Sequence, residues 1–268
     1  MKVYLEKWWM TMRVSWSNLL VYRVNFILQG IAPLFVFLVV KLSLWYKIFE
    51  SSPQAQVGGY HFEEMAAYHL WILIASLLIF NGNSQRISED IRLGRITSYL
   101  IYPFQLWEFH AASFLARSWF QLFIALGTLF GAWALLGGRL ALPSPAALLA
   151  GLGLALLGGL FWFWVNFMVG LVGFWLEETW TLMVMLQIVT YFLSGAIIPL
   201  ELYPDWMQTL LSFTPFPYIA YWPARLFMGH LDQVGWVFGA LAFWVVVMAL
   251  AAWWTWRAGM RLYTAAGM

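Results

Sequence analysis

The chain has 268 residues, of which 63% are hydrophobic, 20% aromatic and only 10% charged. A soluble domain is about a quarter charged, so this chain has too little charge to cover a water-facing surface. It contains no cysteine, which excludes disulfides, Cys-ligated zinc and iron–sulfur clusters. Its net charge of +2 is too small for nucleic-acid binding. We therefore expect a membrane protein with no nucleic-acid partner.

Six stretches are long and apolar enough to cross the bilayer as helices, which requires roughly 20 residues each. They lie at residues 22–45, 63–83, 109–136, 147–175, 180–199 and 234–256. The expected fold is thus an all-α membrane protein with six transmembrane helices in a single domain, residues 1–268.

An even number of spans places both termini on the same side of the membrane, and the distribution of Lys and Arg indicates which side. On the side of the termini we count Lys2, Lys7, Arg13, Arg23, Arg86, Arg92, Arg95, Arg257 and Arg261. On the opposite side we count Lys41, Lys47, Arg139 and Arg225. The excess predicts cytoplasmic termini in a bacterial plasma (inner) membrane.

Residues 1–21 combine polar and aromatic faces at helical spacing. Lys2, Glu6, Arg13 and Ser17 share one side, and tryptophans such as Trp8 and Trp16 lie around the rest. This pattern is typical of an amphipathic helix in the membrane interface. The alternative is a cytoplasmic extension of the first span.

Residues 84–107, which we call the knuckle, form the longest cytoplasmic loop. Their apolar positions fall on two faces, one before and one after Gly94: Ile87 and Ile91, then Leu93, Ile96 and Leu100. Pro103 ends the second run. The pattern predicts two short helices that meet at Gly94, pack on each other through the isoleucines and project into the cytoplasm.

Residues 199–229, which we call the outer segment, hold five of the ten prolines. A helix over residues 206–214 would cover only about half of the hydrocarbon core. Because the segment is also too apolar for an aqueous loop, we expect two short re-entrant helices that dip back from the outer face.

The sequence lacks the nucleotide-binding loop GxxxxGK[ST] and the hydrolase motifs GxSxG and HExxH. We therefore expect no catalytic residue and no cofactor in this chain. His61, Glu63, Glu64 and His69 cluster where the second span begins. A metal or proton site is one interpretation, but polar residues at a helix entry are the favoured one, and we predict no metal site.

Several polar residues lie inside the predicted spans. Arg117 is expected to extend its side chain to the cytoplasmic face or, alternatively, to pair with Glu177 or Glu178. The remaining residues are Asn25, Gln29, Asn166 and Gln187. Hydrogen bonds between helices explain them, and with Arg117 they are candidates to line a substrate path.

Glycines at spacings that allow close helix packing occur in three places: Gly127 with Gly131, Gly235 with Gly239, and the run from Gly151 to Gly159. Such spacings are common in membrane spans and are only weakly specific for dimerisation.

Two motifs resemble one known family. Residues 88–103, SEDIRLGRITSYLIYP, are similar to the ED-I-R-x-G pattern of type-2 ATP-binding-cassette (ABC) exporter permeases. The outer segment resembles the external segment of the same family at Tyr203-Pro204, Trp206, Leu210, Pro215 and Phe227-Met228-Gly229. Both motifs lie where a six-span chain would place them, so the resemblance covers essentially the whole length.

The resemblance implies a permease subunit driven by ATP and Mg on a partner ATPase. Two ATPases and a second permease, identical or paralogous, would complete the unit, with the first and fifth spans at the permease interface. The knuckle would be the coupling helix, through Glu89, Asp90, Arg92, Gly94 and Arg95. The outer segment would form a gate, for which Trp206, Leu210 and Phe213 are the candidates.

Two other function classes are weighed against this one. An ATP-independent channel or ion-coupled carrier would need paired acids or histidines in mid-membrane, and a membrane enzyme would need an acid–base pair near one face. The aromatic spans favour a lipidic or amphipathic cargo, although the same residues suit contact with membrane lipids.

Overall fold

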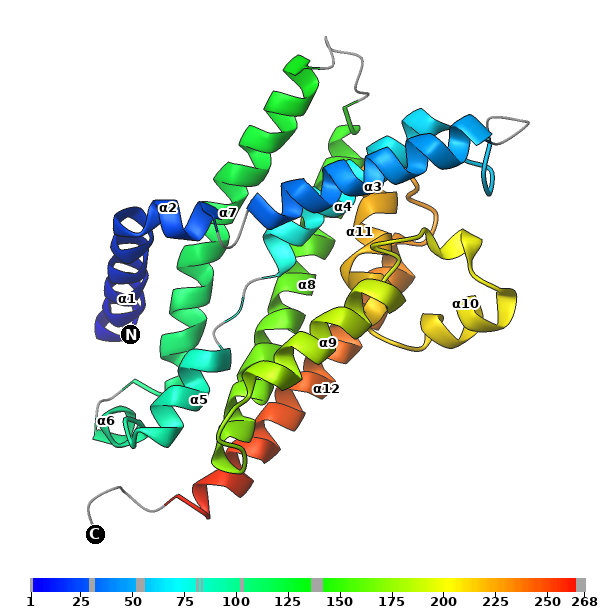
Figure 1. Ribbon diagram of the computed structural model, residues 1–268. Helices are drawn as coiled ribbons and strands as arrows, with labels where there is room; N and C mark the ends of the chain where they lie inside the picture. Colours follow the sequence, from blue (N-terminus) through cyan, green and yellow to red (C-terminus); the bar gives the residue numbers. More distant parts are fainter. Residues whose placement is uncertain are drawn as a thin grey trace.

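The computed structural model describes residues 2–28, 32–51, 56–80, 82, 84–101, 104–135 and 142–263. Within these ranges the chain is helical, and its β structure is limited to an isolated bridge between Val57 and Tyr60. The α-helices are α1 (Lys2–Val21), α2 (Arg23–Phe26), α3 (Ala32–Ser51), α4 (Phe62–Ile79), α5 (Ser84–Arg92), α6 (Ile96–Ile101), α7 (Leu106–Leu135), α8 (Pro145–Leu171), α9 (Trp180–Leu193), α10 (Asp205–Ser212), α11 (Tyr221–Phe227) and α12 (Val234–Met260). Figure 1 shows the long helices as a tilted bundle, with α10 set to one side.

Five stretches, containing α3, α4, α7, α8 and α12, are long and apolar enough to cross a membrane. The sequence predicted six. The predicted span at 180–199 corresponds to α9, which is apolar but has only 14 residues. It ends at Leu193 because the chain turns there, with Gly195 in the left-handed region at φ +80°.

The predicted first span, 22–45, is displaced along the chain. The long helix is α3, Ala32–Ser51, so Lys47, which the predicted span left outside, lies within a helix together with Lys41. The Lys41 ammonium donates a hydrogen bond to the Ala196 carbonyl at 2.9 Å, and Lys47 pairs with Glu50 at 2.6 Å. These contacts give each charge a polar partner, which is why an apolar helix accommodates it.

The N-terminal helix α1 packs lengthwise against α7 (Figure 1). Tyr4 donates to Glu108, Ser15 donates to Ser113 at 3.0 Å, and the Trp16 ring lies 5.7 Å from that of Phe120. Helix α1 ends at Val21 and Tyr22 forms a turn before α2. Helices α1 and α3 are therefore separate elements with different neighbours, and the placement of α1 in the interface stays a prediction.

Helix α8 is the centre of the bundle, packed by α4, α5, α11 and α12. Its glycines permit this close packing. A Cβ atom added at Gly151 would lie 2.5 Å from the Phe227 ring of α11, and one at Gly159 would lie 3.2 Å from the Leu78 carbonyl oxygen of α4. The predicted close packing along the run from Gly151 to Gly159 is confirmed.

The other two glycine pairs behave differently. A Cβ atom added at Gly127, Gly131, Gly235 or Gly239 would meet no atom of the described chain within 4 Å. These glycines lie on faces of α7 and α12 that no described helix covers, so close packing there, against another subunit, stays a prediction.

Candidate functional site

The knuckle turns at Gly94, as predicted. Helix α5 ends there in a motif in which the Arg95 N–H donates to the Asp90 carbonyl at 2.8 Å and the Gly94 N–H donates to the Ile91 carbonyl at 3.1 Å. Gly94 has φ +69°, a conformation that an added Cβ would strain. Helix α6 starts two residues later, so the two short helices are joined by a hydrogen-bonded turn.

The knuckle is seated on α8. Ile87, Ile91 and Ile96 are buried in one cluster with Phe163, Phe167 and Leu171 of α8. A Cβ atom at Gly170 of α8 would lie 2.7 Å from the Ile87 Cβ and 2.9 Å from the Ser84 carbonyl oxygen. The isoleucines of both short helices are thus buried together, as predicted, and they also pack on α8, which α5 approaches closely at a glycine.

Two further contacts tie the knuckle to distant parts of the chain. Tyr263 donates to the Gly94 carbonyl at 2.9 Å and bonds the Thr97 hydroxyl at 2.9 Å. Arg92 pairs with Glu178, in the turn before α9, at 3.2 Å. The sequence analysis named Glu178 as one of two alternative partners for Arg117. In the structure Glu178 lies against the knuckle.

The five predicted coupling residues divide into two sets. Glu89, Arg92 and Arg95 have exposed side chains, whereas Asp90 is only 4% exposed and Gly94 forms the turn. The Asp90 carboxylate accepts a hydrogen bond from Tyr99 at 3.3 Å and pairs with Arg95 at 3.4 Å. Burial and the adjacent Asp90 charge raise the pKa of Tyr99 to about 12. Asp90 thus joins α5 to α6 from inside the knuckle and does not present its carboxylate at the surface.

The outer segment is built from short helices. Helix α10 has eight residues, about 12 Å in length, and short 3-10 turns flank it at Leu200–Leu202 and Phe216–Ile219. The predicted gate residues Trp206, Leu210 and Phe213 are 68%, 58% and 73% exposed. They project away from the described part of this chain, and their role as a gate stays a prediction.

Side-chain donors satisfy the backbone carbonyls where helices end in this region. Tyr68 donates to Gly195, Tyr203 to Phe192 and Tyr218 to Ser212, each at 2.7 Å. Irregular backbone at membrane depth is tolerated only where protein or a cavity meets its polar groups. These bonds are what a re-entrant segment requires.

A polar cluster anchors the outer segment to the loop before α4. One oxygen of Glu201 accepts hydrogen bonds from Tyr221 at 2.6 Å and from Tyr60 at 3.0 Å, and it lies 3.6 Å from the Arg225 guanidinium. Burial and the Glu201 charge raise the pKa of Tyr60 to about 12. The sequence analysis missed this cluster, although Glu201 and Arg225 are two of the three charged residues between 199 and 229.

The candidate path-lining residues are distributed over several helices. Asn25 lies in α2, Arg117 in α7, Asn166 in α8 and Gln187 in α9, whereas Gln29 lies outside the described residues. Asn166 is 3% exposed and donates to the Trp162 carbonyl at 2.9 Å. The structure described here does not bring these residues together in one path.

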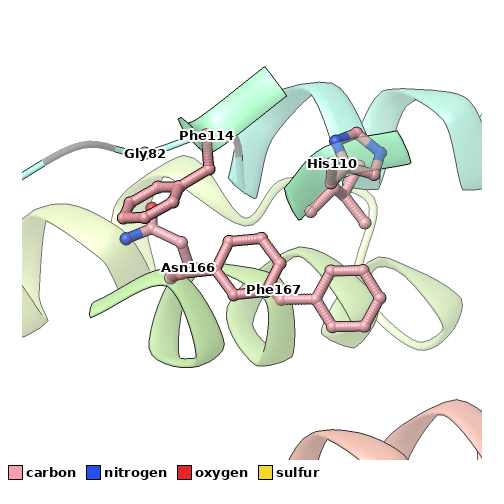
Figure 2. A pocket seen from close by; sticks show the side chains of 7 residues that line it. Gly82, His110, Phe114, Asn166 and Phe167 are labelled. Carbon is pink, nitrogen blue, oxygen red and sulfur yellow. The ribbon is translucent and has the colours of Figure 1, made fainter. Parts of the chain in front are cut away.

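Asn166 and the buried His110 of α7 both line a small cavity beside Ile87. Figure 2 shows Asn166 and Phe114 at one side of this cavity and His110 at the other. His110 did not figure in the sequence analysis, since an isolated histidine in an apolar stretch carries no spacing signal.

The predicted histidine and glutamate cluster is also divided. Glu64 accepts a hydrogen bond from the His61 backbone N–H at 2.9 Å, which caps the start of α4. His69 is 1% exposed, with its ring 6.1 Å from that of Trp45. The described residues contain no group of three or more His, Asp or Glu side chains placed to hold a metal ion.

The span-length apolar helices define an all-α, multi-pass membrane protein, with the knuckle and the outer segment as its two regions of short helices. Residues 35–267 match the family described as ABC-2 family transporter protein. The chain belongs to this family and is the membrane component of an ABC transporter. Members are generally permeases without catalytic activity and usually pair with ABC ATPases. No curated protein sequence matches the chain.

Gly170 provides a test of how the knuckle is seated. Because its added Cβ would meet the Ser84 backbone at 2.9 Å, we expect Gly170→Ala to destabilise the protein by about 1–3 kcal/mol. The control Gly127→Ala has open space and should be neutral or stabilising by up to about 1 kcal/mol. Thermal unfolding of the two variants in detergent measures the difference, and equal midpoints would contradict the close packing.

Glu201 provides a test of the polar cluster. Glu201→Gln removes the charge that Arg225 and two tyrosines share, and we expect a loss of about 1–3 kcal/mol. Glu50→Gln removes an exposed pair with Lys47 and should change stability by less than about 0.5 kcal/mol. Unfolding midpoints that shift equally in the two variants would show that the cluster does not stabilise the fold.

Proposed function

We propose that this chain is the permease subunit of a bacterial ABC exporter in the plasma membrane, with ATP hydrolysed by a separate ATPase subunit. The observation that carries the proposal is the knuckle, a two-helix element with exposed charges that is seated on the central helix of the bundle. A working unit of two permeases and two ATPases follows from the family resemblance. The alternative is an ATP-independent channel or ion-coupled carrier.

Contacts at the two ends of the bundle support six crossings and not five. One end joins the start of α1, the knuckle, the turn at Glu178 and the C-terminal Tyr263 through the bonds described above. The other end joins Tyr60 to the outer segment. The start of α1 and Tyr263 lie at one end only if α9 crosses, so we propose that α9 and the turn after it form the fifth of six spans.

The proposed orientation places the knuckle end in the cytoplasm, because most basic residues belong to it. Movement of an ATPase against the exposed face of the knuckle would be transmitted to α8 at Gly170 and to α9 through Arg92 and Glu178. This coupling works only if the two nucleotide states of the ATPase hold the knuckle in different geometries.

The ion-coupled alternative has one observation in its favour. His69 and His110 are both buried in apolar helices, where ionisable groups often mark ion pathways. They belong to separate clusters, with the His69 ring against Trp45 and the His110 ring 6.3 Å from Phe167. Full transport by the chain alone in liposomes, without an ATPase, would favour this alternative.

Charge reversal on the knuckle tests the ATPase contact. We expect Glu89→Lys to reduce co-purification with the partner ATPase by at least about tenfold, because a lost charge pair costs about 1.5–3 kcal/mol. Asp90→Asn should instead lower the unfolding midpoint, because Asp90 is internal. Glu177→Lys, in the neighbouring turn, is the control and should retain binding. If Glu89→Lys binds the ATPase as the wild type does, the assigned contact is wrong.

Cysteine labelling tests the re-entrant gate. The chain has no cysteine, so Leu210→Cys and Phe213→Cys each introduce a unique thiol. We expect a bulky, membrane-impermeant reagent to label them at least about tenfold more slowly than Gln233→Cys, an exposed position before α12, because lipid or a second permease covers the apolar face. Labelling at the rate of Gln233→Cys would identify α10 as an ordinary exposed helix.

A further inference from the structure

A large cavity lies at the knuckle end of the bundle, separate from the outer segment. It has a volume of about 1090 Å³, is partly open, and is lined by the start of α7, the second half of α8 and the second half of α12. Tyr4 of α1 and Tyr99 of α6 complete its wall. This volume is slightly above the about 300–1,000 Å³ that is usual for small-molecule sites.

The wall of the cavity is mainly aromatic and aliphatic. Trp107, Trp164, Trp253 and Trp256 all contribute to it. The α12 side of the wall is also exposed at the surface: Val246 is 57%, Leu250 55% and Trp253 45% exposed. In a membrane-spanning helix this exposed wall borders lipid, so the cavity is open to a hydrocarbon chain from the bilayer.

A cation lies at the cavity edge. The Arg257 guanidinium is 3.8 Å from the centre of the Trp253 ring, and both residues line the cavity. Arg257 is exposed and sits in the last turn of α12, at the end that holds the knuckle. Stacking on the indole holds the guanidinium at the mouth, where its N–H donors are available to an anion.

Glu108, the acidic residue in the wall, does not offset the positive charge of Arg257. It is 6% exposed, and its two oxygens accept hydrogen bonds from the Tyr4 hydroxyl and from the Gln105 backbone N–H. Both bonds belong to the junction of α1 with the start of α7. Arg257 is therefore the charged group that the cavity presents to a ligand.

We infer that this cavity binds one phospholipid from the membrane leaflet on the knuckle side, with an acyl chain among the tryptophans and the phosphate at Arg257. Basic pockets between transmembrane helices at the cytoplasmic side are suited to anionic lipid head groups, and tryptophan favours this depth of the bilayer. The inference rests on membrane insertion and not on ATP coupling. A failure of the exporter proposal would therefore leave it standing.

The bound lipid would also contact the knuckle. Tyr99, which donates to Asp90 inside the knuckle, lines the same cavity as Trp256 and Arg257 of α12. An acyl chain there would fill space between α6 and α12 that the described protein leaves open. Occupancy would thus support the seating of the knuckle on the bundle.

Native mass spectrometry of the full-length chain tests the inference. The chain is released from detergent micelles after incubation with phosphatidylglycerol or, in a parallel arm, with phosphatidylethanolamine. We expect one retained lipid per chain, and Arg257→Gln should lower its affinity by about fivefold, as loss of one basic contact predicts. Arg261→Gln removes an exposed arginine one turn further along that does not line the cavity, and should retain the lipid.

A second pair of variants tests the hydrocarbon part of the site. Ala249→Phe places a ring in the cavity and should displace the lipid, whereas Ala242→Phe, at an exposed position of the same helix outside the cavity, should not. Photo-cross-linking of the wild-type chain with a phosphatidylglycerol that carries a diazirine on its acyl chain supplies an independent readout should Ala249→Phe fail to fold. We expect cross-links on α12 residues 245–257.

The results of these experiments either overturn the lipid site or identify the part of the head group that it recognises. Equal retention in Arg257→Gln and Arg261→Gln, or cross-links spread evenly over the exposed faces of α3 and α9, would overturn the site. Stronger retention of phosphatidylglycerol than of phosphatidylethanolamine would support an anionic head group at Arg257. Equal retention of the two, with the Arg257 effect intact, would support recognition of the phosphate they share.

Discussion

The close approach of three segments to α8 is the constraint on which the rest of the structure depends. Lipid tails are as apolar as leucine, so helices in a membrane are held together mainly by tight packing. The side chain of Phe227 fits against Gly151, the backbone of α4 against Gly159, and Ile87 of the knuckle against Gly170. The outer segment, the bundle and the knuckle are thereby attached to one helix.

This arrangement gives a physical route between the two ends of the protein. Helix α8 contacts α11 near its start and α5 near its end, so a change in the seating of the knuckle changes the position of the helix that supports the outer segment. Packed helices of this kind move as units and do not deform continuously. The exporter function that we propose needs that property, since ATP would be hydrolysed at one end of the bundle and cargo would leave at the other.

The polar groups in and around the outer segment pair with backbone carbonyls that its short helices leave unsatisfied. Short helices leave backbone carbonyls without helical partners, and tyrosine hydroxyls and the Lys41 ammonium occupy several of them. The cluster around Glu201 then ties the segment to Tyr60, across a sequence separation of 141 residues. These bonds add to the packing of α11 against α8 and α4 in holding the segment on the bundle.

The sequence by itself determined the class of protein and its local elements. Low charge and span-length apolar stretches indicated a membrane protein, and the pattern around Gly94 located the turn of the knuckle. Both signals are local, because a helix end needs only residues close in the chain and composition needs no structure.

Only the tertiary structure decided which faces are covered. In the folded chain Asp90 is buried and Glu178 pairs with Arg92. Lys41 of α3 lies beside the Ala196 carbonyl. Gly170 is a packing contact, whereas Gly127 faces open space. Each of these depends on a partner far away in the sequence. A periodic pattern shows that a residue lies on a given face of its helix, but the neighbour that packs there is set by how the helices assemble, and that determines which charges are paired.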